Sequence, residues 1–401
     1  MKIYLSENEK AEGKKVALDD LMLTADMPTT AGSKMLDGYK SLFGADVIDR
    51  LSKAGYSISG KLNTGEFGID VLGETSYFGA CKNDDGTLAA AASLALKDES
   101  LTAAVCLDVT GTVRRAAAVS GLVSIKPTYG TVSRFGTIPV ACSGETVSVM
   151  AVTAEKCSEV LDVIAGHDDK DGTSLPDDKC ALVKSGAAFT PIKKVALAKS
   201  LISGADAATI AKIDAFRAVL AKNGIETEEI DDSVLKAAGT VWNILMNSEL
   251  CNNVSRYDGV KYGYRSKNYR DIDELYTNSR TESFGELLKI AVLAGSENLS
   301  TDNYMKYYDK ALRVRRVICE KFAGIFNSFD AVLMPACSKA SYTEEDVKSN
   351  LYLAFDENIY TAPASITGLP AVVAGGVQLV GSAFSENALL AVAALVEKEG
   401  K

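Results

Sequence analysis

Histidine is nearly absent from this sequence, because His167 is the only one among 401 residues. A histidine-based catalytic triad would have to use this residue, and a metal site with several histidines is excluded. His167 lies in the polar stretch AGHDDKDG, which is typical of an exposed turn. The eight cysteines form no CxxC pair and lie mostly in apolar stretches such as AAVCLDV. We therefore expect a cytoplasmic protein with reduced, buried thiols and no metal site.

Positive charge and long apolar runs are also scarce. The 43 Lys and Arg residues are outnumbered by 53 Asp and Glu residues, which leaves a net charge of −10. Proteins that bind nucleic acid through their own surface usually have a basic face, so we expect no direct nucleic-acid contact. No apolar run reaches the ~18 residues of a membrane span, and the first residues lack the apolar core of a signal peptide. We therefore expect no association with a membrane.

Short apolar runs alternate with helical patterns along most of the chain. The runs VALDDLM, YSISGKLN and LTAAVCLDV predict strands, and KKVALAKS and IETEEID predict two more. The last two flank a helix predicted at residues 205–222 and complete a βαβ-like unit. A further helix is expected between Thr153, which would cap it, and Gly166, which would end it. This alternation predicts one α/β domain over residues 1–401, with a mainly helical section at about 232–330.

The stretch DVTGTVRR, residues 108–115, places a carboxylate, two threonines, a glycine and two arginines between runs rich in Ala and Val. The pattern predicts a tight turn between a buried strand and a buried helix. We expect Thr112 to cap that helix, and Arg114 and Arg115 to pair with Asp108 or to bind nearby carbonyl groups. Threonine acts as a nucleophile when a base adjoins it. The lysines that could swing toward Thr112, each expected in solvent, are Lys14, Lys15 and Lys82.

Two longer segments carry a resemblance to a known family. GKLNTGEFGIDVLGETSYFGACKN and DVTGTVRRAAAVSGLVSIKPTYGTVSRFG resemble the amidase signature family, and TAPASITGLPAV and VQLVGSAFSENALL follow in the same order. Within this family, the segments are most similar to the A subunits of glutamyl-tRNA(Gln)/aspartyl-tRNA(Asn) amidotransferases. The resemblance implies the amidase-signature fold, an α/β fold with a large mixed central sheet covered by helices on both faces.

The resemblance also implies a definite chemistry. Members of the family hydrolyse an amide with a serine nucleophile, a bridging serine in a cis peptide that passes the proton, and a lysine that accepts it. The nucleophile lies in a Gly-Gly-Ser turn whose backbone N–H groups hold the oxyanion. The A subunit releases ammonia from glutamine in this way and needs no cofactor. It works with a B subunit that binds tRNA and uses ATP, together with a small C subunit.

Carried onto this sequence, the resemblance places altered residues at all three catalytic positions. Thr112 stands at the place of the nucleophile, and Leu18 stands at the place of the lysine. The segment KNDDGTLAAAA has no serine before its alanines, so Thr87 is the hydroxyl nearest to the lost bridging serine. Thr110 replaces the first glycine of the turn, while Gly111 matches the second. Because a leucine cannot accept a proton, we expect catalysis by the family route to be lost.

The residues that bind the substrate are altered as well. The arginine and the aspartate that hold the α-groups of glutamine correspond to Ile290 or Ala291 and to Asn358. A neutral pocket would desolvate both charges of a zwitterion without a partner, so we expect glutamine to bind poorly. The other candidates for binding lie in the turn itself and are Thr110, Gly111, Asp108 and Arg114.

Three functions stay open on this basis. The first is a catalytically silent amidotransferase A-subunit-like protein, a pseudoenzyme that acts as a binding or scaffold component with B and C subunits or their homologues. The second is an active glutamine-dependent amidase or amidotransferase subunit that uses Thr112 as its nucleophile. The third is a small-molecule binding protein that uses the old pocket for an unidentified ligand. The joint loss of three catalytic side chains favours the first.

Overall fold

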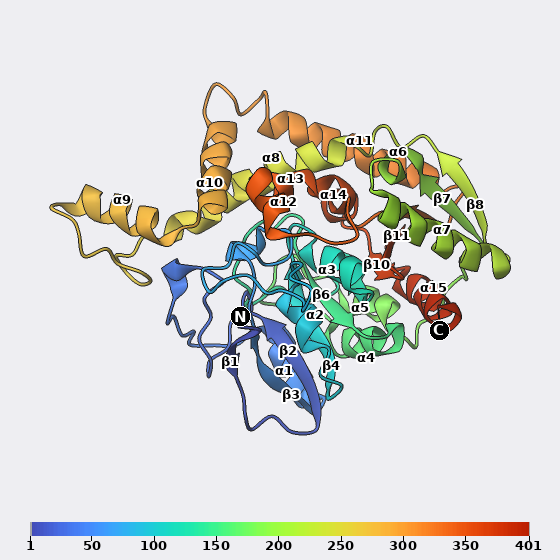
Figure 1. The fold of residues 1–401 in the computed structure, drawn as a ribbon, viewed down its shortest axis with the longest axis horizontal. Coiled ribbons are helices and arrows are strands. Elements are labelled where there is room, and N and C mark those ends of the chain that lie inside the picture. Colours follow the sequence, from blue (N-terminus) through green and yellow to red (C-terminus); the bar gives the residue numbers. More distant parts are fainter. Residues whose placement is uncertain (1, 401) are drawn as a thin grey trace.

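The computed structural model describes residues 2–400, and within them one sheet of eleven strands spans the molecule (Figure 1). The strands lie side by side in the order β1-β3-β2-β4-β6-β5-β10-β11-β9-β7-β8. Their bounds are Tyr4–Glu7 (β1), Lys14–Asp19 (β2), Tyr56–Leu62 (β3), Leu101–Asp108 (β4), Val123–Lys126 (β5), Thr146–Ala151 (β6), Lys194–Ala198 (β7), Glu226–Ile230 (β8), Ala331–Met334 (β9), Ala371–Ala374 (β10) and Val377–Gly381 (β11).

Parallel and antiparallel pairs are combined in this sheet. β2 is parallel to β3 and β4, and β7 is parallel to β8 and β9. The strands between β4 and β9 pair antiparallel, and β1 pairs antiparallel with β3. The prediction of a large mixed sheet is therefore confirmed. The βαβ unit is confirmed as well, because a helix joins β7 to its parallel neighbour β8.

Helices cover both faces of the sheet (Figure 1). α1 and α4 pack together on one face, whereas α2 and α3 pack together on the other. The helix bounds are Asp46–Lys53 (α1), Ala91–Ala95 (α2), Thr112–Ser120 (α3), Ala154–Ile164 (α4), Asp177–Cys180 (α5), Lys199–Ile202 (α6), Ala207–Lys222 (α7), Ala237–Asn253 (α8), Ile272–Ser283 (α9), Glu286–Leu299 (α10), Tyr308–Ile325 (α11), Glu344–Ser349 (α12), Leu353–Asp356 (α13), Asn358–Thr367 (α14) and Glu386–Glu399 (α15).

The starts of α4 and α7 follow from their first side chains. Thr153 caps α4 as expected, since its hydroxyl accepts the N–H of Lys156 at 3.2 Å. α7 begins two residues later than the start of the predicted range, because Asp206 takes the cap position and accepts the N–H of Thr209 at 2.7 Å. A side-chain oxygen at the cap satisfies an N–H group that has no partner within the helix.

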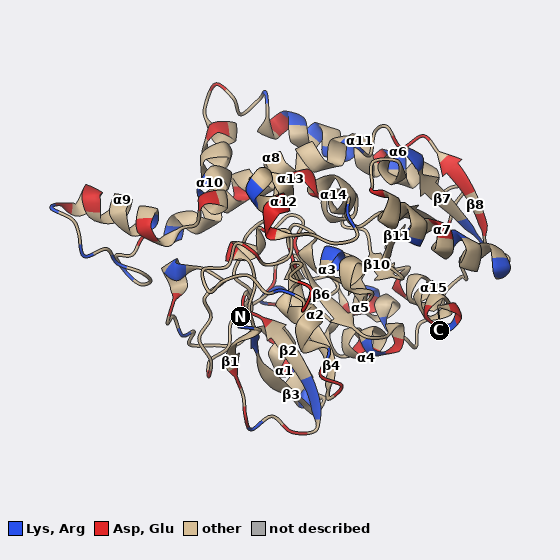
Figure 2. Cartoon of the chain, viewed as in Figure 1, with Lys and Arg blue, Asp and Glu red and all other residues tan. Residues whose placement is uncertain are grey.

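The section after β8 is mainly helical. α8 packs against α10, α11 and α14, and α9 extends from the body of the molecule at the left of Figure 1. At the opposite end, β8 forms the edge of the sheet and is strongly acidic (Figure 2). Lys194 of β7 pairs with Glu228 of β8 at 2.7 Å. Charged side chains on an edge strand oppose its pairing with another chain.

The side chains of β2 show how one strand serves both faces. Val16 and Leu18 join the apolar cluster that contains α1 and α4, whereas Ala17 joins a second cluster with α2 and α3. Successive residues of a strand point to opposite faces, so Asp19 lies on the same face as Ala17. Among residues 2–400, no helix combines the length and the apolar character that crossing a membrane requires.

Candidate functional site

The turn after β4 is held closely between the sheet and α14. Gly111 has a φ angle of +82°, and a Cβ atom at this residue would lie 2.2 Å from Cβ of Thr361 on α14. The hydroxyl of Thr361 donates to the carbonyl oxygen of Thr110 at 3.0 Å. Glycine is therefore required here by the left-handed backbone and by the close approach of α14.

Thr112 is the first residue of α3 and contacts a loop from a distant part of the chain. Its hydroxyl donates to Oδ1 of Asp70 at 3.0 Å and lies 3.0 Å from the hydroxyl of Thr110. Gly111 is the N-cap residue, and no side chain caps α3. The prediction that Thr112 caps this helix is therefore wrong, because Thr112 stands one position inside it. Sequence reasoning missed Asp70 as its partner.

Both arginines of the turn are fully buried and hold neighbouring elements together. Arg114 pairs with Asp108, with 2.7 Å between Nε and Oδ2. The other N–H groups of Arg114 donate to Thr361 O, Gln378 Oε1 and Ser365 Oγ. Arg115 donates to the carbonyl oxygens of Asp70, Val71 and Thr110. These contacts agree with the prediction that the two arginines bind Asp108 and nearby carbonyl groups.

A cavity lies beside Thr112, between β2, β4, α2, α3 and the loop that follows β3. The space that it leaves for the centres of water-sized groups is about 40 Å³. Its polar side chains are Asp19, Asn63, Thr64 and Thr112, together with the thiol of Cys106. Among the residues that the structure describes, no lysine, arginine, histidine or serine lines this cavity.

Asp19, rather than Leu18, is the residue of β2 that lines the cavity. Leu18 is fully buried on the opposite face of the sheet, with α1 and α4, so it does not reach the site where we expected it. The carboxyl group of Asp19 accepts the N–H of Leu107 at 2.5 Å and the N–H of Leu21 at 3.2 Å. Burial raises the pKa of Asp19 to about 7.

The loop after β3, GEFGIDVLGE, supplies further carboxyl groups that sequence reasoning did not single out. Asp70 is fully buried, and its Oδ2 atom has no hydrogen-bond partner among residues 2–400. Burial raises the pKa of Asp70, and burial also raises the pKa of Glu66 to about 7. For Glu74, burial and the nearby Asp70 charge raise the pKa to about 7. Of these carboxyl groups, Asp70 contacts Thr112, whereas Glu66 and Glu74 line a separate cavity.

Two of the lysines that we considered as partners for Thr112 are engaged elsewhere. Lys14 pairs with Glu159 at 2.5 Å, and Lys82 pairs with Glu344 at 2.7 Å. Each pair is partly exposed to solvent, as the sequence suggested for these lysines.

Sequence reasoning also missed Lys61, a fully buried lysine on β3. Its Nζ atom lies 3.1 Å from Oδ1 of Asp20 and donates to the carbonyl oxygen of Met22 and the hydroxyl of Thr29. The strand pattern YSISGKLN contains this lysine, but its polar partners come from a different segment, the loop after β2. Lys61 does not line the cavity beside Thr112.

The other predicted site residues also lie away from this cavity. Thr87 belongs to the turn before α2, and its hydroxyl donates to the neighbouring Asp85. Asn358 is fully buried at the start of α14, where its amide group donates to Asn243 of α8 at 2.6 Å. Ile290 of α10 lines a separate cavity, which also contains carboxyl groups of the loop after β3. The structure therefore brings together Thr112, Thr110 and Gly111, but not these residues.

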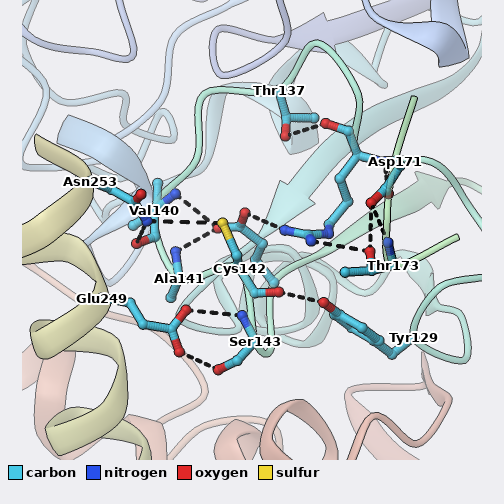
Figure 3. Close-up of polar contacts among 12 residues, drawn as sticks. Tyr129, Thr137, Val140, Ala141, Cys142, Ser143, Asp171, Thr173, Glu249 and Asn253 are labelled. Carbon is cyan, nitrogen blue, oxygen red and sulfur yellow. Dashed lines mark hydrogen bonds and ion pairs between the residues drawn. The ribbon is translucent and has the colours of Figure 1, made fainter. Parts of the chain in front are cut away.

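Residues 127–145, which follow β5, form a loop that ties the sheet to α8 (Figure 3). Glu249 of α8 accepts the N–H of Ser143 at 3.0 Å and also binds its hydroxyl. Asn253 of the same helix donates to the carbonyl oxygen of Val140 at 3.1 Å. None of these residues lines the cavity beside Thr112, so this part of the family-like region supports the fold.

The fold and the segments that resemble the amidase signature family can now be compared with known proteins. A family model described as Amidase matches residues 9–390. The chain therefore belongs to the amidase signature family. One relative, the A subunit of glutamyl-tRNA(Gln) amidotransferase from Coxiella burnetii, is 34% identical over 407 aligned residues, which cover 96% of this chain and 83% of that one. The corresponding protein of Acinetobacter baylyi is 35% identical, with coverage of 95% and 81%.

Solved structures share this fold. The crystal structure of the glutamyl-tRNA(Gln) amidotransferase A subunit from Thermotoga maritima matches with a TM-score of 0.80 at 25% identity, covering 99% of this chain and 87% of that one. An allophanate hydrolase variant from Kluyveromyces lactis is 20% identical with a TM-score of 0.82, covering 96% and 61%, and shows the fold alone. This amidase-family protein thus combines the fold of the amidotransferase relatives with a cavity that contains a carboxyl group and, among residues 2–400, no amine.

Proposed function

We propose that this amidase-family protein is an amidotransferase A-subunit-like component that acts by binding and does not hydrolyse amides by the serine–serine–lysine route. The observation that carries the proposal is the chemistry of the cavity. Thr112 and Asp19 line it, and within residues 2–400 no lysine and no serine does. At the end of β2, where the family resemblance implies a lysine, the cavity meets the carboxyl group of Asp19.

Hydrolysis by the family route needs an amine with a free lone pair to accept the proton of the nucleophile. The buried lysine on β3, Lys61, is already engaged by hydrogen-bond acceptors outside this cavity. Its Nζ atom donates to Met22 and Thr29 and pairs with Asp20. These contacts hold Nζ of Lys61 away from Thr112, and Lys61 does not line the cavity in which a nucleophile would act.

The relatives support a role in an assembly. The matched proteins are A subunits of glutamyl-tRNA(Gln) amidotransferases, and the alignment covers 83% of the one from Coxiella burnetii. The B and C subunits, or homologues of them, are therefore the partners to test first. In such an assembly this chain would supply a binding surface or a ligand pocket, while another subunit performs the chemistry.

Amide hydrolysis with Thr112 as the nucleophile is a second candidate function. One observation favours it, the 3.0 Å hydrogen bond from the Thr112 hydroxyl to Asp70, because a carboxylate at this distance can act as a general base. Asp70 must be ionised for this role. Burial raises its pKa, which lowers the ionised fraction but makes the remaining carboxylate a stronger base. Asp70 does not line the cavity beside Thr112, so a leaving amine in that cavity has no direct path to it for a proton. We therefore rank this function second.

The test is ammonia release from glutamine, asparagine and simple amides, by the purified chain alone and with B and C subunits added. The wild-type protein is compared with Thr112→Ala and Asp70→Asn, and Thr301→Ala serves as a control at an exposed residue. We expect no ammonia above the buffer rate in any mixture, together with co-elution of the chain with a B or C subunit. Turnover that is lost in Thr112→Ala and kept in Thr301→Ala would refute the proposal and establish the second candidate.

A further inference from the structure

Asp19, whose carboxyl group lines the cavity beside Thr112, forms no ion pair with any of residues 2–400. Asp19 is held by the N–H groups of Leu107 and Leu21, each of which donates to a different carboxyl oxygen. These hydrogen bonds fix the position of the carboxyl group and leave lone pairs on both oxygens for a ligand. The ammonium group of Lys61 is engaged by Asp20, at 3.1 Å. Asp19 is therefore a fixed acceptor that forms no ion pair among residues 2–400, although the nearby charge of Lys61 acts to lower its pKa.

The remainder of the cavity is small and largely apolar. Leu62, Leu72, Val113 and Met150 line it, together with the alanines at the start of α2. The space open to the centres of water-sized groups is only about 40 Å³, so the cavity takes a small group. A fitting ligand therefore has few non-hydrogen atoms, a cationic end and a short apolar body.

We propose that this cavity binds a small alkylammonium ion, with the ammonium group on Asp19 and the alkyl chain against the apolar wall. The inference rests on the proposed binding function and names its ligand class. The ammonium group donates three hydrogen bonds, which the carboxyl oxygens of Asp19 and the hydroxyl of Thr112 can accept. Both residues line the same cavity, on β2 and α3.

Other classes of ligand fit this cavity less well. An anion or a zwitterion would bring a negative charge into the cavity. Among the described residues, no basic side chain lines the cavity to pair with that charge. A neutral amide would leave an ionised Asp19 buried without a counter-charge. Metal ions such as Ca²⁺ need six or more oxygen ligands, and residues 2–400 contain no group of three His, Cys, Asp or Glu side chains suited to a metal.

Binding of a cation requires Asp19 in its ionised form. Burial raises its pKa to about 7, and the titratable groups that face it are Lys61, Asp20 and Cys106. Burial raises the pKa of the Cys106 thiol, so this group stays neutral. The affinity for an alkylammonium ion should therefore rise between pH 5.5 and pH 8, a range in which the amine itself keeps its proton.

Isothermal titration calorimetry in sodium phosphate at pH 8 tests the inference with methyl-, ethyl-, propyl- and butylammonium chloride. Propionamide and propionate are the neutral and anionic probes of similar size. We expect binding of ethyl- or propylammonium, no binding of the amide or the anion, and more than tenfold weaker binding at pH 5.5. Asp19→Asn should weaken binding at least tenfold, whereas Asp84→Asn, at an exposed carboxylate before α2, should leave it unchanged.

Thr112→Val is a second variant, in which we expect weaker binding by a smaller factor because only one acceptor is lost. Circular dichroism verifies that each variant is folded. Equal binding by the wild type and folded Asp19→Asn, binding of propionamide as tight as that of propylammonium, or no binding of any alkylammonium ion overturns the inference. Ammonia release is measured in the same samples. Amide turnover refutes the proposed function, whereas a lack of alkylammonium binding without turnover refutes only the ligand class.

Discussion

Removing the guanidinium group of Arg114 tests the structural role of the turn after β4. Arg114→Met keeps much of the side-chain length but leaves the fully buried carboxylate of Asp108 without its cation. Breaking a buried ion pair by removing one partner costs about 3–5 kcal/mol. The variant also loses the hydrogen bonds that link α3 to α14 and β11. We therefore expect the free energy of unfolding to fall by at least about 4 kcal/mol.

The assay is urea unfolding followed by circular dichroism, for Arg114→Met, Asp108→Asn and the double variant. The double variant buries no unpaired charge, so it should be more stable than the sum of the single effects by about 1–3 kcal/mol. Arg313→Met is a control, because Arg313 is an exposed arginine of α11 whose pair with Asp309 lies at the surface, and its loss should matter far less. A folded Arg114→Met protein within about 1 kcal/mol of the wild type, with additive effects in the double variant, would refute the reasoning.

Two further predictions concern the glycines that flank α3 and the buried carboxyl groups. Gly111 and Gly121 both have left-handed φ angles, +82° and +71°, which cost an alanine about 1–2 kcal/mol. Gly111→Ala should lower the melting temperature more than Gly121→Ala, because only the Cβ at Gly111 meets Thr361, and equal shifts would contradict this. Burial raises the pKa of Asp19 and Glu66 to about 7, so between about pH 4 and pH 7 the native protein binds more protons than the unfolded chain. The free energy of unfolding should therefore fall as pH rises through this window, by up to about 4 kcal/mol for Asp19. Urea unfolding at pH 5 and pH 8 measures this change, and Asp19→Asn should reduce it.

Much of the fold could be predicted because its elements carry local signals. β4 and β7 are apolar runs of strand length, and the cap at Thr153 marks the start of α4. The order of the strands carries no such signal. β5 and β10 pair through Lys126 and Ala371, which are far apart in the sequence, and neither run specifies its partner. The sheet order therefore needed the structure.

The candidate site shows the same division between local and distant contacts. The pairing of Arg114 with Asp108 could be predicted, because the two residues flank one turn and lie six positions apart. The contact of Thr112 with Asp70 spans 42 positions. The family resemblance covers both segments, but it did not single out Asp70 as a partner of Thr112. A strand changes face at every residue, so the sequence pattern alone did not decide whether position 18 or Asp19 enters the cavity.

The electrostatics of this site favour a cationic ligand. Burial raises the pKa of Asp19 to about 7, so near neutral pH its carboxyl group is only partly ionised. A cation that enters the cavity reverses this effect for Asp19, because an opposite charge lowers the pKa of a carboxyl group and stabilises its ionised form. Cation binding should therefore release a proton from Asp19 near neutral pH. A lysine at the same point would repel an ammonium ion, so the feature that disfavours the family's proton transfer is also the one that attracts a cationic ligand.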